Sequence, residues 1–198
     1  MKEVYKIGNN LRMIKYTLNR EELYEFLDPI DSKMTKKIHA IIKTHEKHGG
    51  DESKELDKIS DLVSKMFQDD MSSSVYILER TRVAEDGKVM VFPLSFVIYS
   101  TGRADDKNAH MELIYTNKKA LNVGYAEMLV ESSFKDLKEQ GYTSVTSVVA
   151  DDNIPSLNFN QKLIKKLADG RAYNRDNGTY GFNFDITKLK TKAKEMAD

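Results

Sequence analysis

The fold of this chain is decided by residues His110 to Leu163, which read HMELIYTNKKALNVGYAEMLVESSFKDLKEQGYTSVTSVVADDNIPSLNFNQKL. The first seven of these residues are aliphatic and β-branched enough to predict a strand, and residues 143–150 predict a second strand. Between the strands, apolar residues recur at helical spacing over residues 126–137, and Gly141 ends that helix. The stretch is therefore predicted to fold as strand, loop, helix and strand, with another helix opening near Asn153.

The loop between the first strand and the helix has the composition of an anion site. The first amides of a helix lack partners within the helix, and the helix dipole adds roughly half a positive charge at that end. Gly124 and Ala126 allow a diphosphate to approach these amides, because neither carries a bulky side chain, and Lys118 and Lys119 precede them. The alternative is an ordinary strand–helix connection with solvated lysines, and these residues alone do not separate the two.

The order of these elements, with Gly124-Tyr-Ala126 in the loop and Asn153-x-x-Ser156 at the next helix, resembles the acetyl-CoA-binding core of the GCN5-related N-acetyltransferases (GNAT). In that family the loop reads Arg/Gln-x-x-Gly-x-Gly/Ala, and an Asn begins the helix after the second strand. The sequence departs from the pattern in three places. Leu121 stands at the Arg/Gln position, Asn160 stands where many members carry the tyrosine that protonates the leaving thiolate, and Ile164-Lys165 replace a Gly-Phe pair.

The resemblance implies an α/β (α+β) fold. Its central sheet is mixed and mostly antiparallel, with one parallel pair that splays apart and with helices on the faces. One GNAT-like domain over residues 1–198 is implied, with acetyl-CoA as the cosubstrate in the notch between the two parallel strands. An amine of a small molecule or of a protein then attacks the thioester directly.

By the same resemblance, the backbone of the first strand meets the pantetheine arm and polarises the thioester carbonyl. The loop residues meet the diphosphate, and the start of the next helix anchors the arm from the second strand. The expected cofactor-binding residues are Ile114, Tyr115, Thr116, Leu121, Asn122, Val123, Gly124, Tyr125, Ala126, Asn153 and Ser156.

Glu112 is the candidate general base. It lies two residues before Ile114, so strand alternation predicts that the two side chains share a face. Partial burial raises the pKa of a carboxylate toward neutrality, which suits a base; a strand-end glutamate paired to a lysine is the alternative. Asn160 cannot donate a proton as a phenol does, so Tyr173 and Tyr180 on the last predicted hairpin are the candidate acids, with bulk solvent as the other option.

Elsewhere the pattern predicts further strands. Residues 11–18, 75–83 and 89–99 have strand composition, and the Asp-Gly signal at 86–87 predicts a hairpin turn between the last two. Pro93 predicts a bulge, or a position whose amide faces no neighbour. After a helix that continues to residue 167 and ends at Asp169-Gly170, a last hairpin is predicted from residues 171–174 and 179–186.

Helices are predicted in the first third of the chain. Asn19 begins a short one that ends at Pro29, and the segment 28–70 is helical, with apolar stripes over residues 34–42 and 56–67. We interpret these stripes as packing against the sheet; a partner-binding face or a homodimer face is the alternative. His45 and His48 form a pair at i, i+3, but ligation of a metal needs a third ligand, so no metal site is predicted.

Composition limits the function further. The chain has 198 residues with 31 basic and 31 acidic ones, and this zero net charge argues against a large nucleic-acid surface. The absence of Cys excludes disulfides, thiolate catalysis and Cys-ligated zinc. No apolar run reaches the roughly 18 to 20 residues of a membrane span, and the N-terminus lacks a signal-peptide core, so a soluble, cytoplasmic protein is predicted. The basic tail 188–198 is interpreted as a frayed, solvated helix.

Three hypotheses of function remain open at this stage. The first is an acyl-CoA-dependent N-acetyltransferase. The second is a catalytically inactive descendant of that fold that serves as an interaction or assembly module, which the loss of the Arg/Gln and Tyr residues favours. The third is an unrelated binder of nucleotide phosphates that uses the same strand, loop and helix.

Overall fold

The computed structural model describes residues 2–8, 10–18, 33–45, 61, 72–102 and 107–190. The strands in these residues are β1 (Lys2–Gly8), β2 (Leu11–Leu18), β3 (Ser72–Val83), β4 (Val89–Thr101), β5 (Asn108–Thr116), β6 (Ser144–Ala150), β7 (Ala168–Asn174) and β8 (Thr179–Leu189). The helices are α2 (Lys33–Ile42), α4 (Tyr125–Glu139) and α5 (Ile154–Lys166), with short 3-10 turns η1 (Lys43–His45) and η2 (Lys118–Ala120). None of these helices is both long and apolar enough to cross a bilayer.

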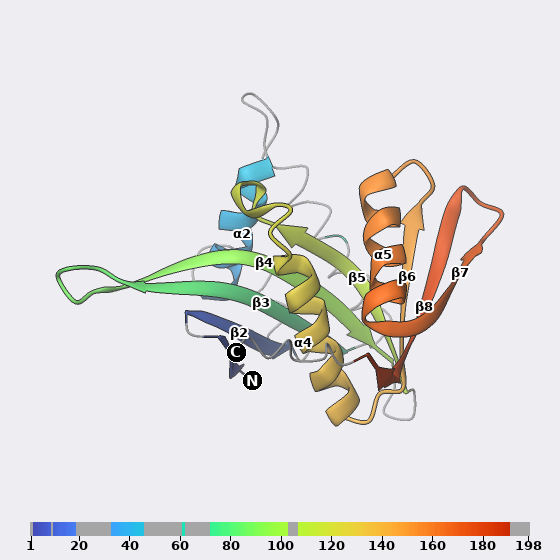
Figure 1. Ribbon diagram of the computed structural model, residues 1–198, viewed down its shortest axis with the longest axis horizontal. Helices are drawn as coiled ribbons and strands as arrows, with labels where there is room; N and C mark the ends of the chain where they lie inside the picture. The colour runs from blue at the N-terminus through green and yellow to red at the C-terminus, as the bar shows by residue number, and fades with distance from the viewer. Residues whose placement is uncertain are drawn as a thin grey trace, which may run out of the picture.

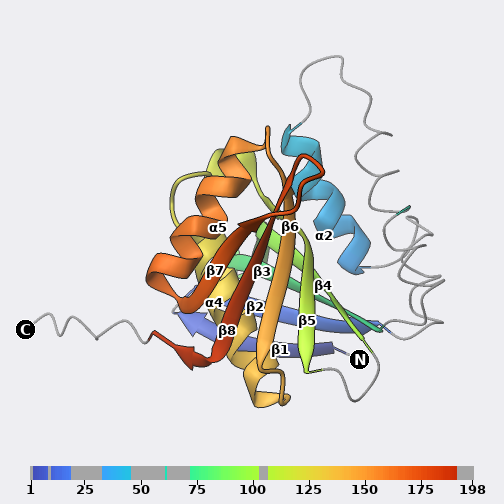
Figure 2. The same ribbon diagram turned by 90° about the vertical axis from the view of Figure 1, so that its right-hand side faces the viewer.

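The strands form one twisted sheet in the order β1-β2-β3-β4-β5-β6-β8-β7. All neighbours in this order are antiparallel except β5 and β6, which are parallel. Helices α4 and α5 cover one face of the sheet and α2 covers the other (Figures 1 and 2). The predicted fold class, a mostly antiparallel mixed sheet with one parallel pair and flanking helices, is therefore confirmed.

Two apolar clusters hold the helices to the sheet. The larger lies between the sheet and the helices α4 and α5, and its central aromatic side chains, Tyr76, Tyr99 and Phe134, are fully buried. The smaller lies under α2, where Ile38 and Ile41 pack on the opposite face. The apolar stripe predicted over residues 34–42 is thus a packing face.

Several boundaries differ from those predicted. Strand β1 was missed, because its side chains only alternate between exposed and half-buried and so give a weak apolar pattern. Residues 72–74 belong to β3, and Asp169-Gly170 belong to β7 instead of ending the helix. The predicted helices over 19–29 and 56–67 lie outside the described residues, as does the tail from 191 to 198. The single-domain organisation stays a prediction.

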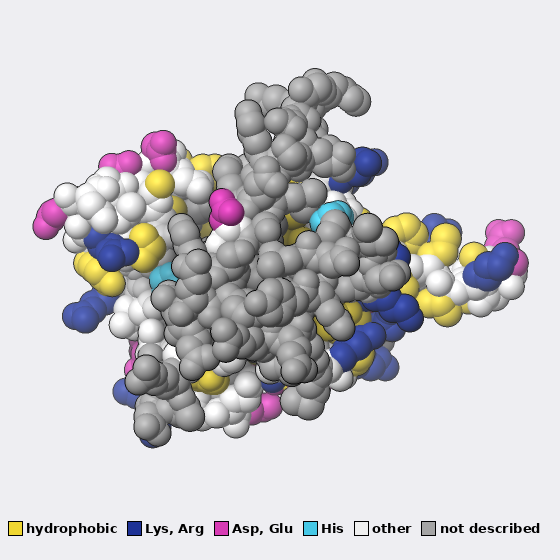
Figure 3. Space-filling view, turned by 180° about the vertical axis from the view of Figure 1, so that it is seen from behind, with side chains coloured by type: hydrophobic (Ala, Val, Ile, Leu, Met, Phe, Trp, Pro, Cys, Tyr) yellow, Lys and Arg dark blue, Asp and Glu magenta, His cyan; other side chains and the backbone are white. Residues whose placement is uncertain are grey.

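The hairpin of β3 and β4 extends beyond the rest of the sheet as a two-stranded arm (Figures 1 and 3). Pairing of β2 with β3 ends at Arg80, and pairing of β5 with β4 ends at Ser95. Val83 and Val89, beyond these points, are 66% and 61% exposed. At the base of the arm, Leu78 pairs with Ser95, and the next residue, Glu79, pairs with Pro93. Leu94 is therefore an extra residue of β4, and the strand has a bulge here, as Pro93 predicted.

A buried carboxylate ties α4 to the first three strands. Asp136 is 6% exposed, and its carboxylate lies 3.0 Å from the ammonium of Lys15. The same carboxylate accepts hydrogen bonds from the hydroxyls of Tyr76 (2.6 Å) and Tyr5 (2.7 Å) and from the amide of Gln140 (2.6 Å). Burial and the bond to Asp136 raise the pKa of the Tyr76 hydroxyl, so the phenol stays protonated and keeps donating.

Removing the negative charge of Asp136 is expected to destabilise the protein. In Asp136→Asn the buried ammonium of Lys15 loses its nearer counter-ion and keeps only Glu3, 3.9 Å away, which we expect to lower the free energy of unfolding by about 3 kcal/mol. Urea denaturation measures the change. The matched control is Glu131→Gln on the same helix, whose pair with Lys135 is at the surface; there we expect a loss below about 0.5 kcal/mol. Equal losses in the two variants would show that the buried pair adds no stability.

Candidate active site

The two parallel strands separate halfway along their length. Cα partners between β5 and β6 run from Asn108 with Ser144 to Met111 with Ser147, and the described strands form no pair beyond that point. Residues 112–116 of β5 and 148–150 of β6 therefore carry backbone groups that face a gap instead of a neighbouring strand. We call the point after Met111 and Ser147 the fork.

A bulge in β5 causes the separation. Ile98 on β4 pairs with Leu113 and Tyr99 pairs with Met111, so Glu112 has no partner of its own. An extra residue of this kind bends its strand and increases the local twist, which turns the rest of β5 away from β6. The bulge also changes which face of the sheet the following side chains occupy. Met111 and Leu113 would share a face in a regular strand, but here Met111 packs in the larger core and Leu113 packs against the smaller one.

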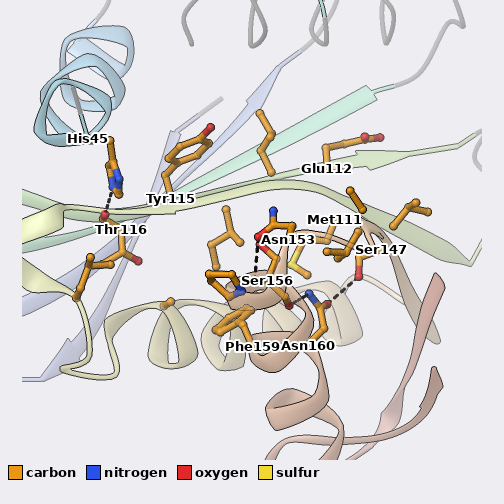
Figure 4. A pocket seen from close by; sticks show the side chains of 18 residues that line it. His45, Met111, Glu112, Tyr115, Thr116, Ser147, Asn153, Ser156, Phe159 and Asn160 are labelled. Atoms are coloured by element: carbon orange, nitrogen blue, oxygen red, sulfur yellow. Dashed lines mark hydrogen bonds between the residues drawn. The ribbon is translucent and has the colours of Figure 1, made fainter. Parts of the chain in front are cut away.

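The gap opens into a cavity of about 500 Å³. Its walls come from the separated halves of β5 and β6, the start of α4, the first turns of α5 and, on the far side of β5, the η1 turn (Figure 4). The residues lining it are His45, Met111, Glu112, Leu113, Ile114, Tyr115, Thr116, Leu121, Ala126, Ser147, Val148, Val149, Ala150, Asn153, Pro155, Ser156, Phe159 and Asn160.

The corner between β5 and α4 presents open backbone amides. Gly124 caps α4 with φ 92°, and a Cβ built there would meet nothing within 4 Å. The first helical bond runs from the Met128 amide to the Gly124 carbonyl at 3.0 Å, so the amides of residues 125–127 have no partner within the helix. Leu121 and Val123 are 45% and 61% exposed, so their side chains do not fill the corner. The arrangement suits an anion.

Backbone groups of β5 also point into the gap. The amide of Asn117 donates to the carbonyl of Leu94 on β4 at 2.7 Å. Because the backbone groups of successive strand residues face opposite neighbours, those of Ile114 and Thr116 face the gap. The carbonyl of Thr116 is met by Nε2 of His45 at 2.6 Å, which leaves the amide and the carbonyl of Ile114 as the free pair.

The start of α5 closes the opposite side of the cavity. Asn153 caps this helix by accepting a hydrogen bond from the Ser156 amide at 3.2 Å. One turn later Asn160, only 2% exposed, accepts from the Ser147 hydroxyl at 2.8 Å and donates to the Ser156 carbonyl at 2.8 Å. Since Ser147 is the last residue of β6 that pairs with β5, Asn160 fixes α5 to the fork.

Comparison with known sequences decides the family. A family model described as the Acetyltransferase (GNAT) family matches residues 41–163, which is more than half of the chain. The chain belongs to the GNAT acetyltransferase family. A search of curated proteins by sequence gives no significant match.

Solved structures share the GNAT fold at low sequence identity. A protein assigned to the GNAT family from Desulfovibrio desulfuricans superposes with a TM-score of 0.54 at 10% identity, covering 89% of this chain and 99% of its own. The ribosomal-protein-S18-alanine N-acetyltransferase from Escherichia coli gives 0.50 at 12% identity, with coverages of 94% and 99%. A chimera of the Vibrio cholerae spermidine N-acetyltransferase gives 0.50 at 11% identity, with coverages of 88% and 96%.

The structure corrects the predicted orientation of Glu112. Alternation predicted that its side chain shares a face with Ile114, but Ile114 packs against the larger core, whereas Glu112 lies on the α2 face beside Ser100 and His110. The bulge is the reason, because the extra residue changes the phase of the strand at this position. In Figure 4 Glu112 and Met111 point to opposite sides of β5, and Glu112 stands directly after the fork.

The candidate acids on the last hairpin do not reach the cavity. Neither Tyr173 nor Tyr180 lines it. Tyr180 packs against the larger core, and the ring of Tyr173 lies over Gly181, within 2.7 Å of where a Cβ would stand. The structure therefore places neither phenol in the cavity wall, and their role as acids stays a prediction.

Two residues of this site were not predicted from the sequence. His45 was considered as a metal ligand and rejected, whereas the structure places it in the cavity wall, bonded to Thr116 and edge-on to the ring of Tyr115. Asn160 was considered only as the replacement of a tyrosine, whereas its side chain is a buried link. A polar residue on the apolar side of a predicted helix was the available signal for Asn160; nothing in the sequence linked His45 to β5.

The link through Asn160 yields a prediction about stability. Asn160→Leu keeps the number of side-chain heavy atoms but leaves the Ser147 hydroxyl without its partner and removes the side-chain hydrogen bond to the Ser156 carbonyl. We expect the free energy of unfolding to fall by about 2 kcal/mol, measured by urea denaturation. The matched control is Asn158→Leu, an exposed position on the same helix, with an expected change within about 0.5 kcal/mol. Wild-type stability of the Asn160 variant would contradict the assigned link.

Proposed function

We propose that the protein transfers the acetyl group of acetyl-CoA to an amine, by direct attack of the amine on the thioester. The observation that carries this proposal is the fork, where two parallel strands separate beside the N-terminus of α4. The backbone groups of the separated strands and the amides of the first turn of α4 border the same cavity. Membership of an acetyltransferase family supports the same chemistry in general.

Acetyl-CoA fits the polar groups along this cavity. The amides at the corner formed by Val123, Gly124 and Ala126 suit the diphosphate, and the exposed Lys118 and Lys119 add positive charge before it. The pantetheine arm resembles a strand in carrying amide groups, so it can bond to the free backbone groups of Ile114 in the gap. On the other side, Asn153 and Ser156 border the path of the arm.

Glu112 is the proposed general base. Its carboxylate stands one residue beyond the fork, on the α2 face, and its side chain is 17% exposed. An acceptor that approaches from the α2 side would bring its ammonium group beside this carboxylate. After the ammonium has lost a proton, the amine nitrogen would face a thioester in the gap. Loss of the proton makes the amine nucleophilic, and backbone amides near Ile114 can stabilise the oxyanion.

No side-chain acid is needed for the departure of CoA. Both polar groups of Asn160 are engaged, and an amide does not donate a proton as a phenol does. A thiol has a pKa of about 8.5, so a thiolate is a stable leaving group near neutral pH and can take its proton from the amine nitrogen or from water.

The acceptor is expected to carry positive charge where it meets the site. Glu112 is the only acidic side chain among the described lining residues, and none of them is Lys or Arg. Two of the neighbours described above name different acceptors, one the alanine of a ribosomal protein and the other spermidine. We therefore propose testing both classes, peptide N-termini and polyamines.

A non-catalytic protein of this family is the second candidate. The residues that favour it are Leu121 and Asn160, which stand where the family pattern has an Arg/Gln and a Tyr. Binding of CoA without turnover of any amine would support this candidate over the enzyme.

Replacing Gly124 is expected to abolish CoA binding for an electrostatic reason. Gly124→Asp places a carboxylate at the proposed diphosphate site, and we expect the affinity for CoA, measured by isothermal titration calorimetry, to fall at least about a hundredfold. Gly141→Asp is the matched control. Gly141 stands just beyond the other end of α4 with φ 94° and also has open space around its Cβ position, so the backbone strain is comparable. Equal affinities in both variants, or no binding by the wild type, would refute the cosubstrate.

Replacing Glu112 tests the proposed base. With acetyl-CoA and a panel of peptides and polyamines, Glu112→Gln is expected to lower kcat/KM about a hundredfold while leaving CoA affinity unchanged, because the side chain faces away from the cofactor side of β5. Release of CoA thiol measures turnover. The control is Glu139→Gln, an exposed residue at the end of α4, for which wild-type rates are expected. A Glu112→Gln variant with wild-type rates would remove this residue from the mechanism.

A further inference from the structure

Glu112 is part of a chain of polar side chains that leads out of the cavity. Its Oε1 accepts a hydrogen bond from the buried hydroxyl of Ser100, and its Oε2 lies 3.9 Å from Nε2 of His110. The other ring nitrogen of His110, Nδ1, lies 2.9 Å from the hydroxyl oxygen of Thr146 on β6. His110 is 32% exposed, so the chain begins at the fork and ends at solvent.

The chemistry of the proposed reaction requires such an exit. An ammonium and acetyl-CoA give an amide, CoA thiol and one free proton. The first proton leaves the ammonium for Glu112 before the C–N bond forms, and the second leaves the amine nitrogen for the thiolate when the C–S bond breaks. Glu112 then holds the surplus proton and must lose it before the next turnover, because a protonated carboxyl cannot act as a base.

We propose that His110 takes this proton from Glu112 and passes it to solvent. The step rests on the proposed function. Glu112 returns to the carboxylate as the imidazole becomes imidazolium, and the imidazolium then loses its proton to water. The 3.9 Å separation exceeds a hydrogen bond, so transfer uses one bridging water or a small approach of the two side chains. His110 does not touch the substrate; it acts through Glu112.

The surroundings of His110 permit both protonation states. The hydroxyl of Thr146 accepts from the Asn108 amide at 3.3 Å and can either donate to Nδ1 or accept from it. His110 pairs with Ser100 on β4, and its ring lies beside Thr146 on β6 and Glu112 on its own strand; of these three partners only Glu112 is titratable. Imidazole also titrates nearer to neutral pH than other side chains, which suits a relay.

Chemical rescue separates a relay from a structural role. His110→Gln is expected to lower kcat about tenfold to a hundredfold with little change in the KM for acetyl-CoA. Added imidazole should restore part of the rate in proportion to its free-base concentration, because it can take the proton from Glu112. His45→Gln is the matched control, since His45 lines the same cavity but bonds to a backbone carbonyl; no rescue is expected there. An unchanged kcat, or a loss that imidazole does not restore, would overturn the relay.

A second measurement does not depend on turnover. In nitrogen-detected NMR of the full chain at one fixed pH, the ring nitrogen shifts of His110 should change when Glu112 is replaced by Gln, because the carboxylate beside Nε2 is removed. The ring shifts of His45 should not move. Unaltered His110 shifts would refute the coupling even if no amine in the panel is acetylated. Coupling without turnover would instead refute the proposed function and leave the His110–Glu112 pair in place.

Discussion

The structure depends on the early end of hydrogen-bonded pairing between β5 and β6. Backbone groups in a sheet interior are almost always paired, and leaving them unpaired costs free energy unless water or a ligand replaces the partner. Here the unpaired groups lie beyond Met111 and Ser147 and line a cavity, so a molecule with its own amide groups can complete the ladder. The loop of Gly124, the cap at Asn153 and the base candidate Glu112 are all positioned by this one interruption.

Two residues maintain the interruption from opposite sides. On β5, the unpaired Glu112 bends the strand away from its neighbour. On β6, pairing with β8 continues to Ala150, and Asn160 ties Ser147 to α5, so that strand stays with its other neighbours. The position that the family pattern gives to a tyrosine is therefore occupied here by a residue that serves the architecture of the fork. The loss of a phenol is chemically tolerable because a thiolate is a good leaving group.

Much of this fold could be predicted from the sequence because its signals are local. The strand at 110–116, the helix closed by Gly141 and the turn at Asp86-Gly87 follow from patterns within a few residues. The remaining features depend on pairs far apart in the chain. No local pattern shows that Glu112 would be the unpaired residue of β5, or that Asp136 would meet Tyr5 and Lys15 on the first two strands. The face of Glu112 was predicted wrongly for that reason, while the remaining site residues stay predictions.

The arm of β3 and β4 shows how the chain protects an open edge of its sheet. Beyond Leu94 the described residues place no strand beside the outer side of β4, and valines around it are exposed, which is the combination that recruits strands from other molecules. Pro93 has no amide to offer such a strand, and the extra Leu94 breaks the regular spacing beside it. Pro93 and the bulge therefore interrupt this edge at the root of the arm, which disfavours growth of a cross-chain sheet from it.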